Sequence, residues 1–450
     1  MEWTPDSWTA KATSTLYPDA EALTVAKAKL ESLPPLVTSW EVERLRELIA
    51  EAQDGKRLWL QGGDCAESLA DCTSDIVTSK LKILLQMSLV LLDATKKPVI
   101  RVGRLAGQYA KPRSNPFETV KTADGGSVEL HSYQGDLVNR HEATAAARKP
   151  DPMRLVDGYQ HAAMTLNFVR SLVHGGFADP HHPENWELGD RAQELAPELR
   201  NAYGRARESL RRVLDLAAAL DVRDAALTGV EFFISHEGLN LHYEAAQTRR
   251  VPRRQGYYDL TTHFPWVGER TRALDGPHIE YFRGIVNPIG VKIGPKATAD
   301  EVLRLIEVLN PSNAAGKLVL IARIGAAKVG DVLPGWVRAI EHAKKRVLWV
   351  CDPMHGNTRG TTAGMKTRDV GDVIEEVRAS IAVHRELGTV FGGVHVELTG
   401  ENVTECVGGA MGLADDDLNR NYATLCDPRL NYAQSLELAV AMARELTAAR

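Results

Sequence analysis

Cysteine is scarce in this chain, and several other common features are missing as well. Five cysteines are scattered through 450 residues, and their number is odd. A scaffold built on disulfides is therefore excluded. The longest apolar stretch, around Met87–Leu92, is far too short to span a bilayer, and the N-terminus lacks the basic-then-apolar pattern of a signal peptide. We expect a cytoplasmic protein that does not enter a membrane.

An excess of positive charge is also absent. The formal net charge is −5, so no basic surface argues for binding to nucleic acid. Any anionic ligand must instead be met by a local cluster of Arg and Lys. The chain has no Walker or dinucleotide-binding fingerprint. With 44% hydrophobic and 25% charged residues, its composition is that of an ordinary globular protein with a large core.

The chain does contain a recurrence of short β-branched runs that end in polar or glycine residues. There are eight: Arg57–Gln61, Pro98–Val102, Gly229–Ile234, Trp266–Gly268, Pro288–Ile293, Lys317–Ala322, Arg346–Val350 and Val394–Leu398. Most are apolar at successive positions, as expected for a parallel sheet that is covered on both faces. The fourth run is the weakest, because Pro265 limits it to a very short strand.

Helical patterns alternate with these runs. Ile76–Leu92 follows the first run, and Thr298–Leu309 opens with Thr298 and Glu301 in capping-box spacing. Asp372–Leu387 and Ala433–Ala448 each place apolar side chains on one face. Eight strands that alternate with helices predict a (β/α)8 TIM barrel, of class α/β. An open doubly wound sheet would also alternate, but it needs no eighth strand and usually has a Gly-rich first turn.

Two regions exceed a minimal barrel. Residues 1–55 precede the first strand and include a predicted helix, Val42–Ala52; we expect an N-terminal extension that serves an interface or regulation. Residues 56–450 then form the predicted catalytic barrel. Far more chain than one crossover needs follows the second strand. We expect a helical insertion there, at about 141–225, with helices near Tyr159–Val173 and Arg191–Leu220.

Polar side chains follow every predicted strand, where the catalytic groups of a TIM barrel lie. The cations among them are Arg104, Lys111, Arg113, Arg270, Lys292 and Arg323. Ion pairs with nearby carboxylates, such as Asp64 and Glu269, would account for any single cation. Six together in a chain of net negative charge favour a phosphorylated or carboxylated ligand, because Arg binds phosphate oxygens in pairs and Lys acts as a point charge.

A second group of side chains has the chemistry of a metal site. Cys65, His355, Glu397 and Asp427 combine a thiolate, an imidazole and two carboxylates, a set that suits Mn, Fe, Co or Zn better than Mg or Ca. These residues are remote in sequence, so only the barrel would bring them together. Residue types alone leave His236 and His395 as equal candidates, and they do not establish a metal.

Six longer motifs stand out: Leu60–Glu67, Gly107–Ser114, Trp266–Arg272, Cys351–Thr358, Glu397–Cys406 and Cys426–Asn431. Together they resemble the plant-type (class II) 3-deoxy-D-arabino-heptulosonate 7-phosphate (DAHP) synthases. The resemblance runs from about Leu33 to the C-terminus. It implies a barrel enzyme that condenses phosphoenolpyruvate with erythrose 4-phosphate, the first step of the shikimate pathway to the aromatic amino acids.

The resemblance also implies a role for each group. The metal ligands would be Cys65, His355, Glu397 and Asp427, holding Mn²⁺ or alternatively Co²⁺, Fe²⁺ or Zn²⁺. Phosphoenolpyruvate would be held by Arg104, Glu269, Arg270, Lys292 and Arg323. Lys111, Arg113 and Ser114 would bind erythrose 4-phosphate. The catalytic residues would be Lys292, as proton donor, together with the ligands Cys65 and His355 of a metal that polarises the aldehyde oxygen.

Partners and alternatives follow from the same resemblance. It implies a homo-oligomer (dimer or tetramer), feedback by aromatic amino acids through the extra helices, and a chorismate mutase partner. Gln134, Arg140, Ala327 and Gly330 depart from the family's pattern near the expected aldose side. They keep open a paralogue of specialised metabolism, which serves an antibiotic or phenazine route or takes an amino-sugar phosphate. A non-catalytic regulatory or scaffold relative is a third reading, against which the four metal ligands argue.

Overall fold

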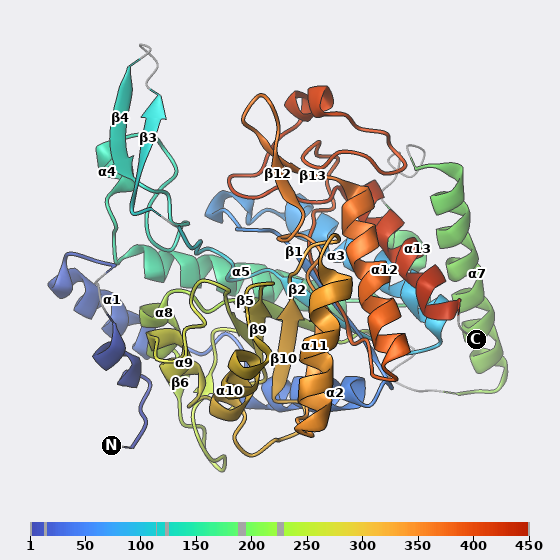
Figure 1. Cartoon of the computed structure of the whole chain (residues 1–450), viewed down its shortest axis with the longest axis horizontal. Helices are drawn as coiled ribbons and strands as arrows, with labels where there is room; N and C mark the ends of the chain where they lie inside the picture. Colours follow the sequence, from blue (N-terminus) through green and yellow to red (C-terminus); the bar gives the residue numbers. More distant parts are fainter. Residues whose placement is uncertain are drawn as a thin grey trace.

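Eight parallel strands close into a barrel in the computed structural model, which describes residues 2–12, 16–113, 115–121, 126–187, 195–222 and 229–448 (Figure 1). The strands are β1 (Leu58–Gly63), β2 (Val99–Arg104), β5 (Phe232–Glu237), β8 (Phe264–Val267), β9 (Ile289–Ile293), β10 (Leu318–Ala322), β11 (Leu348–Cys351) and β14 (Gly393–Glu397). Each pairs with the strand before and after it, and β14 pairs with β1. The predicted TIM barrel is confirmed. The fourth strand is short as predicted, although it begins before Pro265.

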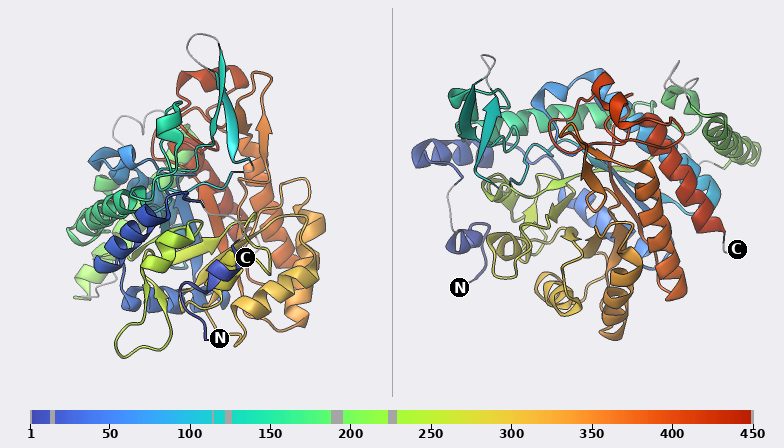
Figure 2. Two further views of the ribbon diagram at one scale, coloured as in Figure 1. Left: turned by 90° about the vertical axis from the view of Figure 1, so that its left-hand side faces the viewer. Right: turned by 45° about the horizontal axis from the view of Figure 1, so that its top comes forward.

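A helix follows each strand and covers the outside of the barrel (Figures 1 and 2). These helices are α3 (Ser74–Thr95), α8 (Leu241–Ala246), α9 (Pro277–Phe282), α10 (Ala299–Leu309), α11 (Val329–His342), α12 (Val370–Glu386) and α13 (Tyr432–Thr447), together with those of the insertion. Thr298 caps α10, where its side chain accepts a hydrogen bond from the amide of Glu301. The helices predicted at these positions are present.

The segment before the first strand contains η1 (Ser7–Lys11), α1 (Ala20–Ser32) and α2 (Ser39–Gln53). Helix α2 begins with a capping box between Thr38 and Glu41. Its buried residues Leu45, Leu48 and Ile49 belong to the same apolar cluster as the inward-facing side chains of the barrel strands. The helix therefore closes the N-terminal end of the barrel, opposite the end where the strands finish.

The chain between β2 and β5 supplies the extra helices that the sequence predicts. It contains a hairpin, β3 (Phe117–Lys121) and β4 (Ser127–His131), then α4 (Ala145–Arg148), α5 (Arg154–His174), η3 (Pro183–Trp186) and α7 (Pro197–Ala219). Residues 191–194 of the predicted second helix lie outside the described residues. The hairpin rises beyond the barrel on one side, and α7 packs against α3 on the other (Figure 1).

Three short hairpins escaped the sequence analysis. Besides β3–β4, they are β6 (Thr248–Arg249) with β7 (Tyr258–Asp259), and β12 (Thr358–Gly360) with β13 (Lys366–Arg368). The last pair matters for the site, because it brings a buried arginine to the rim of the barrel. Among the described residues, no helix is long and apolar enough to cross a membrane.

One buried lysine lies at the closed end of the barrel. Lys317, just before β10, is 8% exposed, and its Nζ donates to the carbonyl oxygens of Ile285 (2.6 Å) and Asn287 (2.7 Å). Burial lowers the pKa of Lys317 to about 7. The neutral amine still carries two hydrogens, one for each carbonyl, so the bonds survive loss of the proton.

This lysine should make stability depend on pH. Between pH 7 and the ordinary lysine pKa of about 10.5, the unfolded chain binds more protons at this side chain than the folded chain does. The free energy of unfolding should therefore rise with pH above pH 7, at up to about 1.4 kcal/mol per pH unit from this group. Lys317→Met should remove that part of the rise in urea unfolding at pH 7, 8 and 9. Lys29→Met, at an exposed position, should keep it; an unchanged slope in Lys317→Met would contradict the assignment.

Candidate active site

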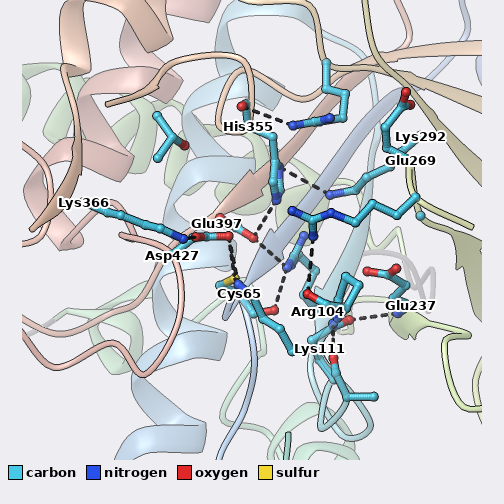
Figure 3. Close-up of a pocket in the computed structure, with 17 residues that line it drawn as sticks. Cys65, Arg104, Lys111, Glu237, Glu269, Lys292, His355, Lys366, Glu397 and Asp427 are labelled. Carbon is cyan, nitrogen blue, oxygen red and sulfur yellow. Dashed lines mark hydrogen bonds and ion pairs between the residues drawn. The ribbon is translucent and has the colours of Figure 1, made fainter. Parts of the chain in front are cut away.

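The C-terminal ends of the eight strands surround a cavity of about 330 Å³ (Figure 3). The side chains that line it include Cys65, Arg104, Lys111, Glu237, Glu269, Arg270, Lys292, Arg323, His355, Lys366, Glu397 and Asp427. Parallel strands deliver these residues to one rim although they are up to 362 positions apart in sequence. The residues predicted for the metal and for phosphoenolpyruvate thus lie around one cavity.

Three of the predicted metal ligands form a tight group. One ligand atom each from Cys65, Glu397 and Asp427 lies within 4.8 Å of the other two. His355 adjoins this group through Glu397, because its Nε2 is 3.2 Å from Glu397 Oε1. His236 lies elsewhere: its Nε2 is 2.9 Å from Glu244 Oε1 in a separate buried network. His395 lies beneath Arg104: its Nε2 contacts Arg104 Nη1, and Arg104 in turn donates to Glu397 Oε1.

The protonation of His355 fits a metal ligand. Its Nδ1 is 2.8 Å from Asp352 Oδ2, and since a carboxylate only accepts, Nδ1 carries the hydrogen. Nε2 of the neutral ring is then a bare acceptor that faces another acceptor, Glu397 Oε1. Two facing acceptors need a proton or a cation between them. A carboxylate that orients a histidine in this way is the usual support of a metal-bound imidazole.

Cys65 would have to lose its proton to bind a metal. A hydrogen bond with Cys426, burial, and the charge of Glu397 raise the pKa of the Cys65 thiol. Lys111 opposes them, since its Nζ lies 2.9 Å from Cys65 Sγ and 2.8 Å from Asp427 Oδ2. The other oxygen of Asp427 accepts from Lys366 Nζ at 2.8 Å. The thiol and this carboxylate are therefore held by cations on the side that faces the cavity.

Glu397 has the most ion pairs of the four predicted ligands. Its Oε1 accepts from Arg104 at 3.1 Å, and its Oε2 is 2.8 Å from Arg368 Nη1. A proton or cation between His355 and Glu397, together with Arg368 and Arg104, holds the pKa of Glu397 well below its usual range in spite of its burial. Arg368 is fully buried and also donates to the carbonyl oxygen of Pro428. It thereby joins Glu397 to the loop that carries Asp427.

Asp352 connects His355, a predicted metal ligand, to Lys292. Asp352 Oδ2 is 3.0 Å from Lys292 Nζ and 2.8 Å from His355 Nδ1, and Oδ1 accepts from the amide of Met354. Burial lowers the pKa of Lys292, while the charge of Asp352 raises it. Lys292 also lies over the ring of Trp266, 5.8 Å from its centroid.

The loops that carry Arg323 and His355 are fastened together by Glu376 of α12. One oxygen of Glu376 accepts from the amides of Ile324 (2.9 Å) and Gly325 (2.8 Å), and the other accepts from Asn357 (2.8 Å). The loops approach so closely that a Cβ on Gly356 would lie 2.3 Å from the nitrogen of Gly325. Arg323 completes the link by donating to the carbonyl oxygen of His355 at 3.2 Å.

The residues expected to bind the aldose lie at an adjoining cavity of about 520 Å³. Lys111, Arg113, Arg270 and Lys366 line it together with the foot of the β3–β4 hairpin. Arg113 is exposed and pairs with Glu118 of β3. Ser114 lies outside the described residues. Arg270 is exposed and donates to the carbonyl oxygen of Pro112, so it lies between the two cavities.

Two cations of the site were missed in the sequence, Lys366 and Arg368. Both belong to β13, a strand of three residues within a hairpin whose other strand is exposed. Such a hairpin has no apolar pattern to reveal it. The signal in the sequence was the run Lys366-Thr367-Arg368 between the turn Thr361–Gly364 and α12, which reads as a solvated loop.

The sequence is similar to known proteins over nearly its whole length. The family model of the class-II DAHP synthetase family matches residues 3–443. A phospho-2-dehydro-3-deoxyheptonate aldolase of Neurospora crassa is 44% identical over 460 residues, which cover 98% of this chain and 94% of that protein. A protein of the same name from Streptomyces coelicolor is 47% identical, and the match covers 95% of this chain and 93% of that protein. Another from Mycolicibacterium smegmatis is 42% identical, and the match covers 95% of this chain and 91% of that protein.

The Asp352 contacts generate a test of the ligand group. Asp352→Asn preserves the shape of the side chain but removes the charge that holds His355 Nδ1–H and Lys292. Loss of such a support weakens metal binding by about 10-fold to 100-fold. Calorimetric titration with Mn²⁺ should show that loss in Asp352→Asn and none in Asp416→Asn, which changes an exposed aspartate. Equal affinities of the two variants would exclude His355 as a metal ligand oriented by Asp352.

Proposed function

We infer the roles of these residues from one premise: the chain belongs to the class-II DAHP synthetase family. The chain is thus a transferase that joins phosphoenolpyruvate to erythrose 4-phosphate and releases DAHP and phosphate. The observation that carries the assignment of roles is the single rim cavity, in which buried cations adjoin the group of Cys65, Glu397 and Asp427.

Phosphoenolpyruvate is placed among Arg104, Arg270, Lys292 and Arg323. Its phosphate and carboxylate carry several negative charges, and these cations line the same cavity. Glu269 contributes indirectly: it accepts from the amide of Gly294 after β9 and from Arg272, so it fixes the loop beside Arg270. Arg side chains bind phosphate oxygens in pairs. Lys292 adds a positive charge, and burial lowers its pKa so that it gives up its proton more easily.

A divalent cation is placed at Cys65, His355, Glu397 and Asp427. The donor set fits, because a thiolate, an imidazole and two carboxylates suit Mn²⁺, Fe²⁺, Co²⁺ or Zn²⁺, of which we favour Mn²⁺. When bound, the cation supplies Lewis-acid polarisation of the aldehyde oxygen of the second substrate. Asp352, Arg368 and Arg104 orient the ligand side chains from outside this group.

Erythrose 4-phosphate is placed along Lys111, Arg113 and Ser114, at the second cavity. C3 of phosphoenolpyruvate then bonds to the aldehyde carbon, water adds at C2, and the C–O bond to phosphate breaks. Lys292 is the proton donor for the oxygen that was the aldehyde, since its Nζ lies in the cavity next to His355. The cations hold the two anionic substrates together, which supplies orientation as well as charge stabilisation.

The biological setting that we propose is the first step of the shikimate pathway, in the cytoplasm. We also propose a homo-oligomer, a dimer or tetramer, in support of which Val213 and Leu216 of α7 and Leu220 at its C-terminal end are 56–66% exposed. Aromatic amino acids as effectors and a chorismate mutase as partner belong to the same proposal. Light scattering of the purified chain, and titration of its activity with Trp, Phe and Tyr, test the oligomer and the effectors.

Removal of the metal is the first test of the reaction. Chelator-treated protein should consume no phosphoenolpyruvate in the presence of erythrose 4-phosphate, and Mn²⁺ or Co²⁺ should restore turnover with one phosphate released per phosphoenolpyruvate. Cys65→Ala should lower kcat by about 100-fold or more, because a ligand and its charge are lost. Cys72→Ala should retain activity, since Cys72 lies away from the cavity and accepts a hydrogen bond from Thr165.

The alternatives give different results in the same assay. Metal-dependent turnover with an amino-sugar phosphate but not with erythrose 4-phosphate would support the paralogue of specialised metabolism. Turnover that persists in metal-free protein, or in Cys65→Ala, would overturn the proposed metal site.

A further inference from the structure

A layer of buried polar side chains lies inside the barrel, directly beneath Arg104. It consists of Trp59 and Gln61 of β1, Ser235 of β5 and His395 of β14, and all four are fully buried. None of them lines the cavity of the site, whereas Arg104 does. Polar groups at such a position are costly unless each finds a partner, so their hydrogen bonds are informative.

The indole of Trp59 sets the direction of every hydrogen bond in the layer. Trp59 Nε1 can only donate, and it lies 3.3 Å from Gln61 Oε1, so the oxygen of the Gln61 amide faces it. The same oxygen lies 2.8 Å from His395 Nδ1. Because an amide oxygen only accepts, His395 must carry its hydrogen on Nδ1.

The rest of the layer agrees with this direction. The amide nitrogen of Gln61 donates to Ser235 Oγ at 2.9 Å, and Ser235 donates in turn to the carbonyl oxygen of Gly103 at 2.9 Å. The ring of His395 also packs edge-on against Trp266, with centroids 5.0 Å apart. These contacts leave the ring no freedom to turn over, and Nε2 remains as its only acceptor.

That acceptor meets Arg104. The Nη1 of Arg104 contacts His395 Nε2, its Nε donates to the carbonyl oxygen of Asp64 at 2.9 Å, and its Nη2 donates to Cys65 O at 3.2 Å and to Glu397. A guanidinium has five N–H donors and no acceptor. Four are directed into the protein by these contacts, and the fifth, on Nη1, remains for a ligand in the cavity.

We propose that His395 is a positioning residue for phosphoenolpyruvate: Trp59 and Gln61 fix its Nδ1–H form, and its bare Nε2 holds Nη1 of Arg104 so that the remaining N–H points at the substrate. This inference rests on the proposed function, in which Arg104 binds phosphoenolpyruvate. A protonated Nε2 in the same place would face the guanidinium donor to donor. The Nδ1–H tautomer is therefore required for the orientation of Arg104.

Two variants that differ by one methylene separate the two ends of the ring. His395→Gln carries a donor and an acceptor on a side chain long enough to reach Arg104. His395→Asn can still donate to Gln61, but its amide is too short to reach Arg104. Ser235→Ala is the matched control, because it removes a buried polar group from the same layer without touching Arg104 and leaves Trp59 to orient Gln61.

The measurements are the dissociation constant of phosphoenolpyruvate by calorimetry on Mn²⁺-loaded protein, KM and kcat, and the melting temperature. His395→Asn should bind phosphoenolpyruvate about 10-fold to 100-fold more weakly, the usual range for a lost hydrogen bond to a charged group. Its KM for phosphoenolpyruvate should rise by more than its kcat falls. His395→Gln and Ser235→Ala should both stay within about threefold of the unmodified protein in binding, which is less than the loss of one hydrogen bond to a charged group.

The outcomes distinguish the inference from its premise. If the unmodified protein binds no phosphoenolpyruvate, the proposed function fails. If it binds and His395→Asn binds equally well, the positioning role is overturned. Equal weakening of all three variants, in parallel with their melting temperatures, would also overturn it, since His395 would then act only on stability. Should His395→Asn not fold, His395→Met, which lacks both the donor and the acceptor, takes its place with the same expected loss.

Discussion

The rest of the site depends on the contacts of one carboxylate, that of Glu397. It is fully buried at the end of β14, and its two oxygens face Arg104, Arg368 and His355. A buried carboxylate without partners would be protonated and would not attract these cations. With these partners, the carboxylate holds three segments together: β2 through Arg104, the β12–β13 hairpin through Arg368, and the loop after β11 through His355. Three separate segments of the chain thus share a single anion.

Two further carboxylates near the cavity, those of Asp352 and Glu376, also hold more than one group each. Asp352 serves Lys292 and His355 with one carboxylate, and Glu376 fastens the loops that carry Arg323 and His355 with another. Burial raises the pKa of Glu376 to about 7, whereas that of Asp352 lies well below its usual range because His355 and Lys292 oppose its burial. The two residues differ in their partners: Glu376 is met by neutral N–H groups, and Asp352 is met by a cation. The carboxylate inside the site, Asp352, is therefore paired with a charged group, whereas the carboxylate at its edge, Glu376, is hydrogen-bonded to neutral donors.

Much of this arrangement was accessible from the sequence. The eight strands were, because runs such as Leu318–Ala322 are apolar at every position, and a closed barrel then requires the residues after them to meet. Two features were not accessible. Arg368 lies on a three-residue strand in a polar hairpin, which has no periodic pattern. The role proposed for His395 depends on which of its ring nitrogens carries the hydrogen. Trp59, which lies on another strand, determines that nitrogen through Gln61, and the residues next to His395 in the sequence do not reveal it.

Lys111 shows how the two halves of the site are connected. Its ammonium contacts Cys65 and Asp427, while its backbone begins the segment that leads through Pro112 to Arg113 at the second cavity. The burial of Lys111 is offset by its contacts with Cys65 and Asp427, so its pKa lies above the usual range and it remains charged. A divalent cation at the proposed site would compete with this ammonium for the thiol and the carboxylate. In the proposed function, charge added at Cys65 and Asp427 would therefore act through Lys111 on the segment expected to hold the aldose, and binding of the metal and of the aldose would be coupled.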